Sequence, residues 1–433
     1  MDKVKIFILG CFWIIASSVF AQEEAESQGE KLSLSLEEAQ KYALEYNRTI
    51  KQQDLSVQKA KKAEWASIAS MLPQVSGKVD YNSYLGYELN MFGQKLPMSD
   101  YMDVSITASM AVSGMQIVAT QLSKLATEMQ ETNKALTDLQ IRSNVATSYY
   151  SVLVTEELKR LLEGNMKNLN RLYESTENSY QVGMLEQTDV DQLKVQLGMM
   201  KNSILSTQRS IELAYNALRM LLGSSSLDIE LTDKLDNEAL LAKAYEVLNS
   251  NFDLDNNFNV QLLDKNIELS QKNVRLNEWA YGPTLSAFYQ YTYKKEFKEG
   301  GFNMTPPNVV GVALNIPIFS SGEKYSKVRQ SKFDLESAQL AKEDAVEGLL
   351  VQEKQLRFNL RNAIDSYELQ KQNVDVRDRI FNNMIQKYEY GTVSMTDLTT
   401  ANNNLISEQM SYVQALLDLV TAQINLQELL NTL

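Results

Sequence analysis

Few side chains in this 433-residue chain could carry out chemistry. It contains no histidine and a single cysteine, Cys11, which lies in an apolar N-terminal stretch. Zinc sites of the usual kind, Ser-His triads and cysteine nucleophiles all depend on His or Cys, so none of them is expected. Catalysis by carboxylates alone would need two acids in one pocket, and no spacing singles out such a pair. The sequence therefore predicts a protein that is not an enzyme and has no cofactor or metal.

The polar residues that do recur belong to two matching turns. "YQVGMLEQTDV" at 180–190 and "YEYGTVSMTDL" at 388–398 share a Tyr, a Gly three residues later and a Thr-Asp five residues after the Gly. Each turn interrupts a long helical pattern. Gly183 and Gly391 can adopt the left-handed conformation found just past a helix end. Thr188, before Asp189, and Thr396, before Asp397, can cap the helix that returns.

These turns are part of an internal duplication. Residues 52–81 align without a gap on residues 262–291, which places Pro73 on Pro283, 210 residues later. Further along the chain the offset is 208 residues, as it is between Gly183 and Gly391. The chain is thus one unit written twice, with a change of two residues in the middle of the unit.

Each unit has the same order of predicted elements. Ser35 and Glu38 form a capping box that starts a short helix, and a second helix runs to Pro73 or Pro283, which we expect to be the helix-to-strand junctions. We expect a signal peptide at 1–21, a first repeat at 22–223, a linker at 224–245 and a second repeat at 246–433. The first repeat would hold a strand pair at about 75–112 and a long helical hairpin at 115–223; the second would hold a strand pair at about 285–318 and a hairpin at 322–431.

Alternating residues identify the strands. "VSITASMAV" at 104–112, "LSAFYQYTYK" at 285–294 and "VVGVALNIPI" at 309–318 each place apolar residues on one side and small or polar residues on the other, with Phe288 as the one exception in 285–294. This period of two predicts strands with one apolar face. The segments 90–100 and 295–307 are polar and contain Gly and Pro, so we expect them to be hairpin loops.

The N-terminal residues predict export from the cytoplasm, and the net charge argues against binding to polyanions. Lys3 and Lys5 precede an apolar run that ends in small residues, which predicts a signal peptide cleaved after Ala21. The alternative is a lipoprotein signal that acylates Cys11. The net charge is −13, and it becomes −14 once the predicted signal, with its one acid and two bases, is removed. Such an acidic chain is not expected to bind nucleic acid.

The strands suggest a membrane. Two hairpins give four strands per chain, and four strands cannot close on themselves, whereas a bilayer requires a sheet without free edges. Strands of about ten residues can cross the hydrocarbon core when tilted. Two chains would close eight strands around a filled interior, and three would close twelve around a lumen.

The whole pattern resembles the TolC-type outer membrane efflux protein family. The resemblance runs from about residue 34 to 433 and rests on the duplicated order of elements, the opening "LSLEEAQKYALEYN", the junctions "MAVSG" and "NIPIFSSG", and the two tips. It implies a mainly helical chain with membrane strands: a homotrimer with a 12-stranded barrel in outer membrane lipid, continued by a long periplasmic α-helical barrel. It also implies a passive duct that works with a periplasmic membrane-fusion adaptor and an inner-membrane transporter of the RND or ABC type, in efflux or type I secretion.

The resemblance also assigns roles to the tips. Gly183, Thr188 and Asp189, with Gly391, Thr396 and Asp397, fall on the family's tip motif and would form an adaptor-docking, gated entrance. Asp397 and Thr400 would line this entrance; the best-known members carry a second acid where this chain has Thr400, and a gate-restraining Arg where it has Val393. Plain helix capping could instead explain the Thr-Asp pairs entirely. The rival interpretation of the chain is a soluble periplasmic coiled-coil scaffold or adaptor, which would leave the apolar strands unexplained.

Overall fold

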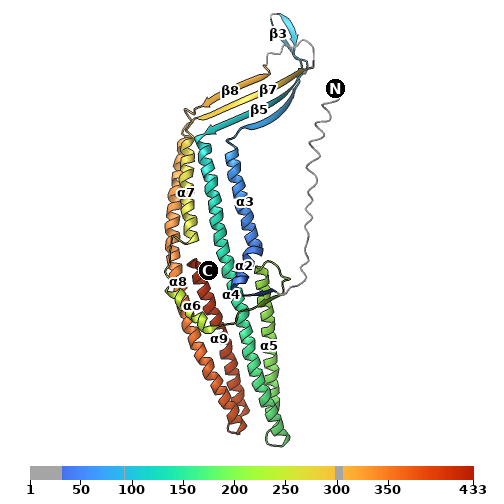
Figure 1. Cartoon of the computed structure of the whole chain (residues 1–433), viewed down its shortest axis with the longest axis vertical. Helices are drawn as coiled ribbons and strands as arrows, with labels where there is room; N and C mark the ends of the chain where they lie inside the picture. The colour runs from blue at the N-terminus through green and yellow to red at the C-terminus, as the bar shows by residue number, and fades with distance from the viewer. Residues whose placement is uncertain (1–31, 92, 298–305) are drawn as a thin grey trace.

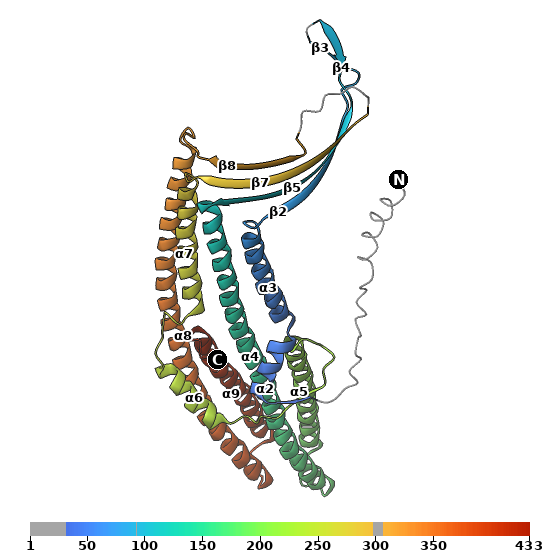
Figure 2. The ribbon, with the colours of Figure 1, turned by 45° about the horizontal axis from the view of Figure 1, so that its top comes forward.

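The computed structural model describes residues 32–91, 93–297 and 306–433. The molecule is elongated, with helices along most of its length and a sheet across one end (Figures 1 and 2). The expected signal peptide, Cys11 and most of the loop at 295–307 lie outside the described residues.

Two long helical hairpins form the body. In the first, α4 (Gly114–Gln181) is followed by α5 (Gln187–Leu221); in the second, α8 (Glu323–Glu389) is followed by α9 (Met395–Leu429). At 1.5 Å per residue, α4 is about 100 Å long. The hairpins contact each other mainly through α4 and α9, and their turns lie together at the end farthest from the sheet (Figure 2).

Shorter helices complete the bundle. They are α2 (Leu36–Tyr46), α3 (Arg48–Ala69), α6 (Asn237–Asn249) and α7 (Phe258–Trp279). The predicted capping box at the start of α2 is confirmed, because the Ser35 and Glu38 side chains each bond the other residue's backbone N–H. α3 packs on α4, and α7 packs on both α4 and α8.

Four antiparallel strands form the sheet, in the order β2, β5, β7, β8. Their bounds are β2 (Gln74–Asn82), β5 (Tyr101–Ser113), β7 (Thr284–Glu296) and β8 (Asn308–Asn315). The central β5–β7 pair joins the strands of the two repeats. Pro73 and Pro283 each stand one residue before a strand, β2 and β7 respectively.

Two small sheets were not expected. The segment 90–100, expected to be a loop, belongs in part to a further hairpin of β3 (Glu88–Met91) and β4 (Gln94–Pro97), where Gly93 reverses the chain with a φ of 84°. The expected linker at 224–245 contains β6 (Ile229–Leu231), which pairs in parallel with β1 (Leu32–Leu34), and the start of α6.

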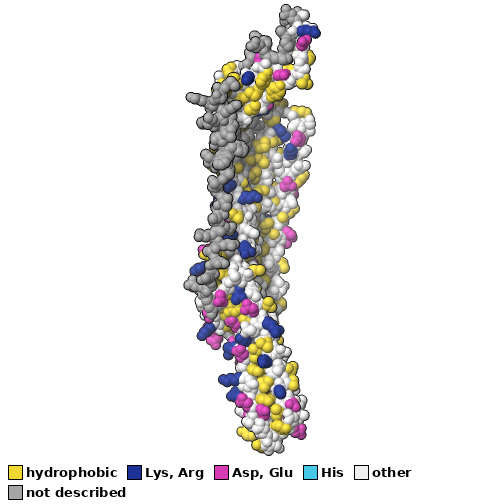
Figure 3. Space-filling view, turned by 90° about the vertical axis from the view of Figure 1, so that its right-hand side faces the viewer, with side chains coloured by type: hydrophobic (Ala, Val, Ile, Leu, Met, Phe, Trp, Pro, Cys, Tyr) yellow, Lys and Arg dark blue, Asp and Glu magenta, His cyan; other side chains and the backbone are white. Residues whose placement is uncertain are grey.

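The main sheet has one apolar and one polar face, as the alternation predicts. Its register places Ile106 opposite Tyr291, and Val112 opposite Leu285, which in turn lies opposite Leu314. These side chains are exposed to solvent, with Leu314 at 60% and Ile106 at 54%. Residues of the other parity, such as Ser105 opposite Thr292, make up the second face. Hydrophobic side chains gather at the sheet end, whereas charges of both signs cover the lower helices (Figure 3).

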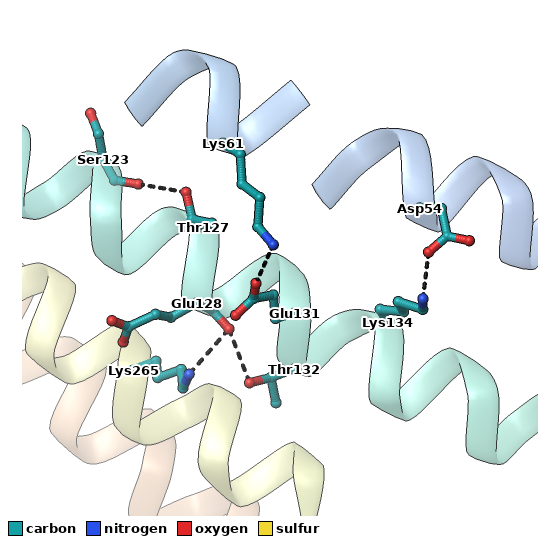
Figure 4. Close-up of polar contacts among 9 residues, drawn as sticks. All are labelled: Asp54, Lys61, Ser123, Thr127, Glu128, Glu131, Thr132, Lys134 and Lys265. Carbon is teal, nitrogen blue, oxygen red and sulfur yellow. Dashed lines mark hydrogen bonds and ion pairs between the residues drawn. The ribbon is translucent and has the colours of Figure 1, made fainter. Parts of the chain in front are cut away.

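The duplication extends to single polar contacts. Asn47 caps α3 and donates to the Leu221 carbonyl (2.7 Å), while Asn257 caps α7 and donates to the Leu429 carbonyl (2.9 Å). Asp54 of α3 pairs with Lys134 of α4 (Figure 4), and the equivalent pair is Asp264 of α7 with Lys342 of α8. Partly exposed ion pairs add little stability, so these contacts mainly fix the register between neighbouring helices.

Candidate functional site: the tips of the two helical hairpins

The two tips reverse the chain in the same way. Gly183 and Gly391 have φ angles of 76° and 67°, in the left-handed region that favours glycine. At the first tip the Met184 N–H donates to the Ser179 carbonyl (2.9 Å), and at the second the Thr392 N–H donates to the Lys387 carbonyl (2.9 Å). Both tips are therefore Schellman turns, in which the glycine lets the chain satisfy the last free carbonyls of the helix.

The returning helices do not begin as predicted. Thr188 and Thr396 were expected to be caps, but they lie inside the first turn, because α5 starts at Gln187 after Glu186, and α9 starts at Met395 after Ser394. The expectation was wrong because each helix begins one residue before the Thr and has its N-cap two residues before it. Thr188 instead donates its hydroxyl to the Glu186 carboxylate (3.1 Å).

The caps of the two helices differ. Ser394 and Asp397 form a capping box, in which the Ser394 hydroxyl accepts from the Asp397 N–H (3.2 Å) and donates to the Asp397 carboxylate (2.7 Å). Glu186 makes no capping hydrogen bond through its side chain. Because Glu186 has no hydroxyl, Asp189, the counterpart of Asp397, cannot pair with an N-cap hydroxyl as Asp397 does.

The side chains expected at the entrance are exposed. The Ser394 hydroxyl and backbone N–H hold the pKa of Asp397 below its usual value, because both stabilise the carboxylate. Thr400 lies one turn further along α9 and donates to the Thr396 carbonyl (2.8 Å). Val393 is partly buried and packs against the apolar core between the hairpins.

A cavity of about 230 Å³ lies between the tips. Thr176 and Met184 from the first hairpin and Tyr388 and Gly391 from the second line it. Burial raises the pKa of the Tyr388 hydroxyl, and the Asp189 carboxylate raises it further. The Tyr388 hydroxyl faces the Thr176 hydroxyl and the Asp189 carboxylate, but neither buried hydroxyl reaches a partner in good hydrogen-bond geometry among the described residues. The tips thus meet through a buried, incompletely bonded polar group.

Two buried amide pairs join the hairpins above the cavity. Asn165 of α4 donates to Gln409 of α9 (2.6 Å), and Asn402 of α9 donates to Gln196 of α5 (3.4 Å). They lie beside a core that includes Phe381. A buried polar pair of this kind favours one relative position of two helices, since a shift would leave amide groups without partners.

These pairs were not recognised in the sequence, although a pattern for them exists. Asn402 and Gln409 occupy places in a series of core positions spaced by three and four residues in α9. The series is Leu398, Asn402, Leu405, Gln409, Tyr412 and Leu416. Polar residues in an apolar series indicate interhelical hydrogen bonds, but only the structure shows which helix holds the partner.

The comparison with protein families decides the classification. A family model described as outer membrane efflux protein matches residues 40–224 and 253–432. The chain belongs to the outer membrane efflux protein family. Two Outer membrane protein TolC sequences are similar to it. That of Vibrio cholerae is 22% identical over 385 residues, covering 85% of this chain and 84% of the relative, and that of Escherichia coli is 21% identical over 429 residues, covering 94% and 83%.

Solved structures share the fold of this outer membrane efflux protein. CusC superposes with a TM-score of 0.74 at 15% identity, covering 94% of this chain and 95% of CusC. The Campylobacter jejuni CmeC outer membrane channel gives a TM-score of 0.69 at 14% identity, covering 94% and 90%. The resemblance inferred from the sequence is thus confirmed: this is a TolC-like fold of the outer membrane, with its helical part in the periplasm.

Two features are absent from the residues that the structure describes. Among the helices of the described residues, none is both long and apolar enough to cross a membrane. Within the same residues, no group of three or more acidic, His or Cys side chains is arranged to hold a metal ion.

Proposed function

We propose that three copies of the chain form an outer-membrane exit duct, which conducts substrates passively from a periplasmic adaptor and an inner-membrane pump to the exterior. The observation that carries this proposal is the four-stranded sheet with one exposed apolar face and one polar face. Because β2 and β8 are its edges, other chains must complete it. Three chains give twelve strands, enough to enclose a lumen lined by the polar face.

Exposed apolar side chains along the helices support the assembly. On α8, Phe333, Leu340, Val351 and Phe358 are 57%, 60%, 67% and 60% exposed at spacings of seven and eleven residues. Such a stripe is typical of a helix that packs on another helix. A neighbouring copy would cover it and extend the bundle into a closed helical barrel.

The tips support adaptor docking. Val182, Met184 and Tyr390 flank the reversing glycines and are 71%, 79% and 83% exposed. Apolar side chains gathered at the extremity of a protein indicate a binding surface. We infer that Gly183, Thr188, Asp189, Gly391, Thr396 and Asp397 belong to the surface that meets the adaptor. Its partner pump, of the RND or ABC type, would supply the energy, as in tripartite efflux or type I secretion.

We also propose that the two hairpins shift against each other when the entrance opens. The Asn165–Gln409 and Gln196–Asn402 pairs and the group around Tyr388 all cross between the hairpins. Packed helices with such contacts move between discrete arrangements.

A planar bilayer recording tests the duct. The mature protein should insert and conduct, and the three Asp397 carboxylates should make the pore prefer cations. Asp397→Asn should lower this preference. Ser394→Ala is the matched control, because it removes the cap and keeps the charge, so its preference should stay at the wild-type level. An unchanged record with Asp397→Asn would remove Asp397 from the entrance, and a protein that never conducts would contradict the duct.

A further inference from the structure

An open groove of about 480 Å³ lies where α4 and α7 meet the sheet. Val112, Leu285 and Leu314 line it; they form one cross-strand row at the helical end of the apolar face. Ile117, 49% exposed on the first turn of α4, extends the lining toward the helices. The groove therefore continues the membrane-facing surface of the sheet to the level where the helices begin.

Trp279 is built into one wall of this groove. A Cβ atom at Gly114 would lie 2.1 Å from Cε3 of the Trp279 ring, and one at Gly282 would lie 2.8 Å from the same atom. Only glycine at both positions leaves space for the ring. The ring is nevertheless 49% exposed. Ala69 of α3 occupies the equivalent position in the first repeat, 210 residues before Trp279. The buried side of this ring is thus a feature of the α4–α7 junction and not of the repeat.

Arg275 adds a positive charge to the groove. It lines the groove one turn before Trp279 in α7 and is exposed. It forms no ion pair or hydrogen bond with any described residue. The acid nearest in sequence, Glu278, lies 3.8 Å from Lys332 of α8. An arginine without a partner beside an apolar surface leaves five N–H donors free for an anion.

We propose that this groove binds a phospholipid of the periplasmic leaflet, with its phosphate on Arg275 and an acyl chain along Val112, Leu285 and Leu314. Arginine bonds phosphate oxygens through two parallel N–H groups. Tryptophan prefers the boundary between hydrocarbon and headgroups, which is where its ring would lie beside the bound glycerol. The leaflet is the periplasmic one because the groove is at the helical end of the strands. This inference rests on the membrane position of the sheet in the proposed duct.

Fluorescence of Trp279 provides the test. The mature chain has two tryptophans, Trp65 and Trp279, because Trp13 lies in the predicted signal peptide. A Trp65→Phe protein therefore reports on Trp279 alone. It would be placed in phosphatidylcholine vesicles that contain a small fraction of either brominated phosphatidylglycerol or a brominated diacylglycerol with the same chains. The quenching should show that the phosphate-bearing lipid associates at least about tenfold more strongly than the diacylglycerol.

Matched variants separate the groove from general lipid contact. Arg275→Gln in the same background should reduce this preference to near onefold, and free inorganic phosphate should not displace the lipid. Trp279→Phe, which leaves Trp65, should show no preference. Equal quenching by the two brominated lipids, or an unchanged preference with Arg275→Gln, would overturn the groove. If the vesicles still conduct, only the groove is overturned; a protein that does not insert overturns both the groove and the duct.

Discussion

The two repeats are alike where α5 and α9 end and differ where these helices begin. At the ends, Asn47 and Asn257 make the same hydrogen bond to the same kind of carbonyl. At the starts, only α9 has a side-chain cap, whereas the reversing glycines are shared. The backbone geometry of a hairpin is thus retained in both copies, and the polar chemistry at the tip is free to differ. This is expected if the tips have separate tasks in one entrance.

Even at the similar ends, one position shows two solutions. Gly223 and Asn431 are 208 residues apart and both have positive φ, 102° and 55°. A Cβ at Gly223 would lie 2.5 Å from the Tyr46 carbonyl oxygen. Asn431 instead donates its amide to the corresponding Asn256 carbonyl (2.6 Å). The Tyr46 carbonyl packs closely against the backbone of Gly223, whereas the equivalent Asn256 carbonyl accepts a hydrogen bond from the Asn431 side chain.

The largest effect is expected from Gly223→Ala. The substitution combines left-handed strain with a backbone clash, so the free energy of unfolding should fall by roughly 2–4 kcal/mol. Asn431→Gly keeps the backbone conformation and loses one hydrogen bond, which should cost only about 1 kcal/mol. Thermal unfolding of the two variants, measured in the same detergent, compares them. Equal losses would contradict the difference between the repeats.

Gly183→Ala and Gly391→Ala should each destabilise a tip by roughly 1–2 kcal/mol, because alanine is strained at positive φ. At both positions the space that a Cβ would occupy has no other atom within 4 Å, so strain alone should act. Gly198→Ala in α5 and Gly348→Ala in α8 are controls inside helices of the same hairpins, and they should stabilise by up to about 1 kcal/mol. Hydrogen exchange of the amides around each substituted glycine measures both the expected loss and the expected gain of stability. A neutral result at either tip glycine would show that its turn is not held as described.

The caps should respond differently at the two tips. Ser394→Ala should destabilise the start of α9 by about 1 kcal/mol, whereas Glu186→Ala should have almost no effect at the start of α5. Glu186→Ser should stabilise α5, since it supplies the missing hydroxyl beside Asp189. Faster exchange at the first amides of the affected helix is the readout. If Glu186→Ala accelerated exchange at the start of α5 as much as Ser394→Ala did at the start of α9, the two caps would be equivalent.

The smallest effect concerns pH. Because the folded-state pKa of Asp397 is lowered, its contribution is present above the unfolded pKa and is lost as pH falls through the folded pKa. Exchange at the start of α9 should therefore accelerate on acidification more than at the start of α5. Asp397→Asn should remove most of this extra pH dependence. An identical acid response at both tips would contradict the role of the capping box.

Much of the fold could be predicted from the sequence because local chemistry marks it. Pro73 and Pro283 mark where helices give way to strands, and Gly183 and Gly391 mark the hairpin turns. Alternation along β7 correctly separated its two faces. Each of these features depends on residues close together in the chain, so periodicity and turn residues suffice.

What could not be predicted depends on choices between near-equal local options or on distant contacts. Near the second tip, Ser394 and Thr396 are both possible caps, and only the exact start of α9 decides between them. The amide pairs between the hairpins and the groove around Trp279 join residues far apart in the sequence. Their partners follow from how the helices pack, which no local pattern determines.

The apolar face of the sheet is the central claim, and spin labels along β7 test it most directly. The sequence has one cysteine, Cys11 in the predicted signal peptide, so a cysteine introduced at any of residues 284–293 would be the only labelling site of the mature chain. In reconstituted membranes, collisions with oxygen should peak at Leu285, Tyr289 and Tyr291, and collisions with a water-soluble paramagnetic reagent should peak at Ser286, Gln290 and Thr292. Equal access of the water-soluble reagent to both sets would contradict a lipid-facing sheet.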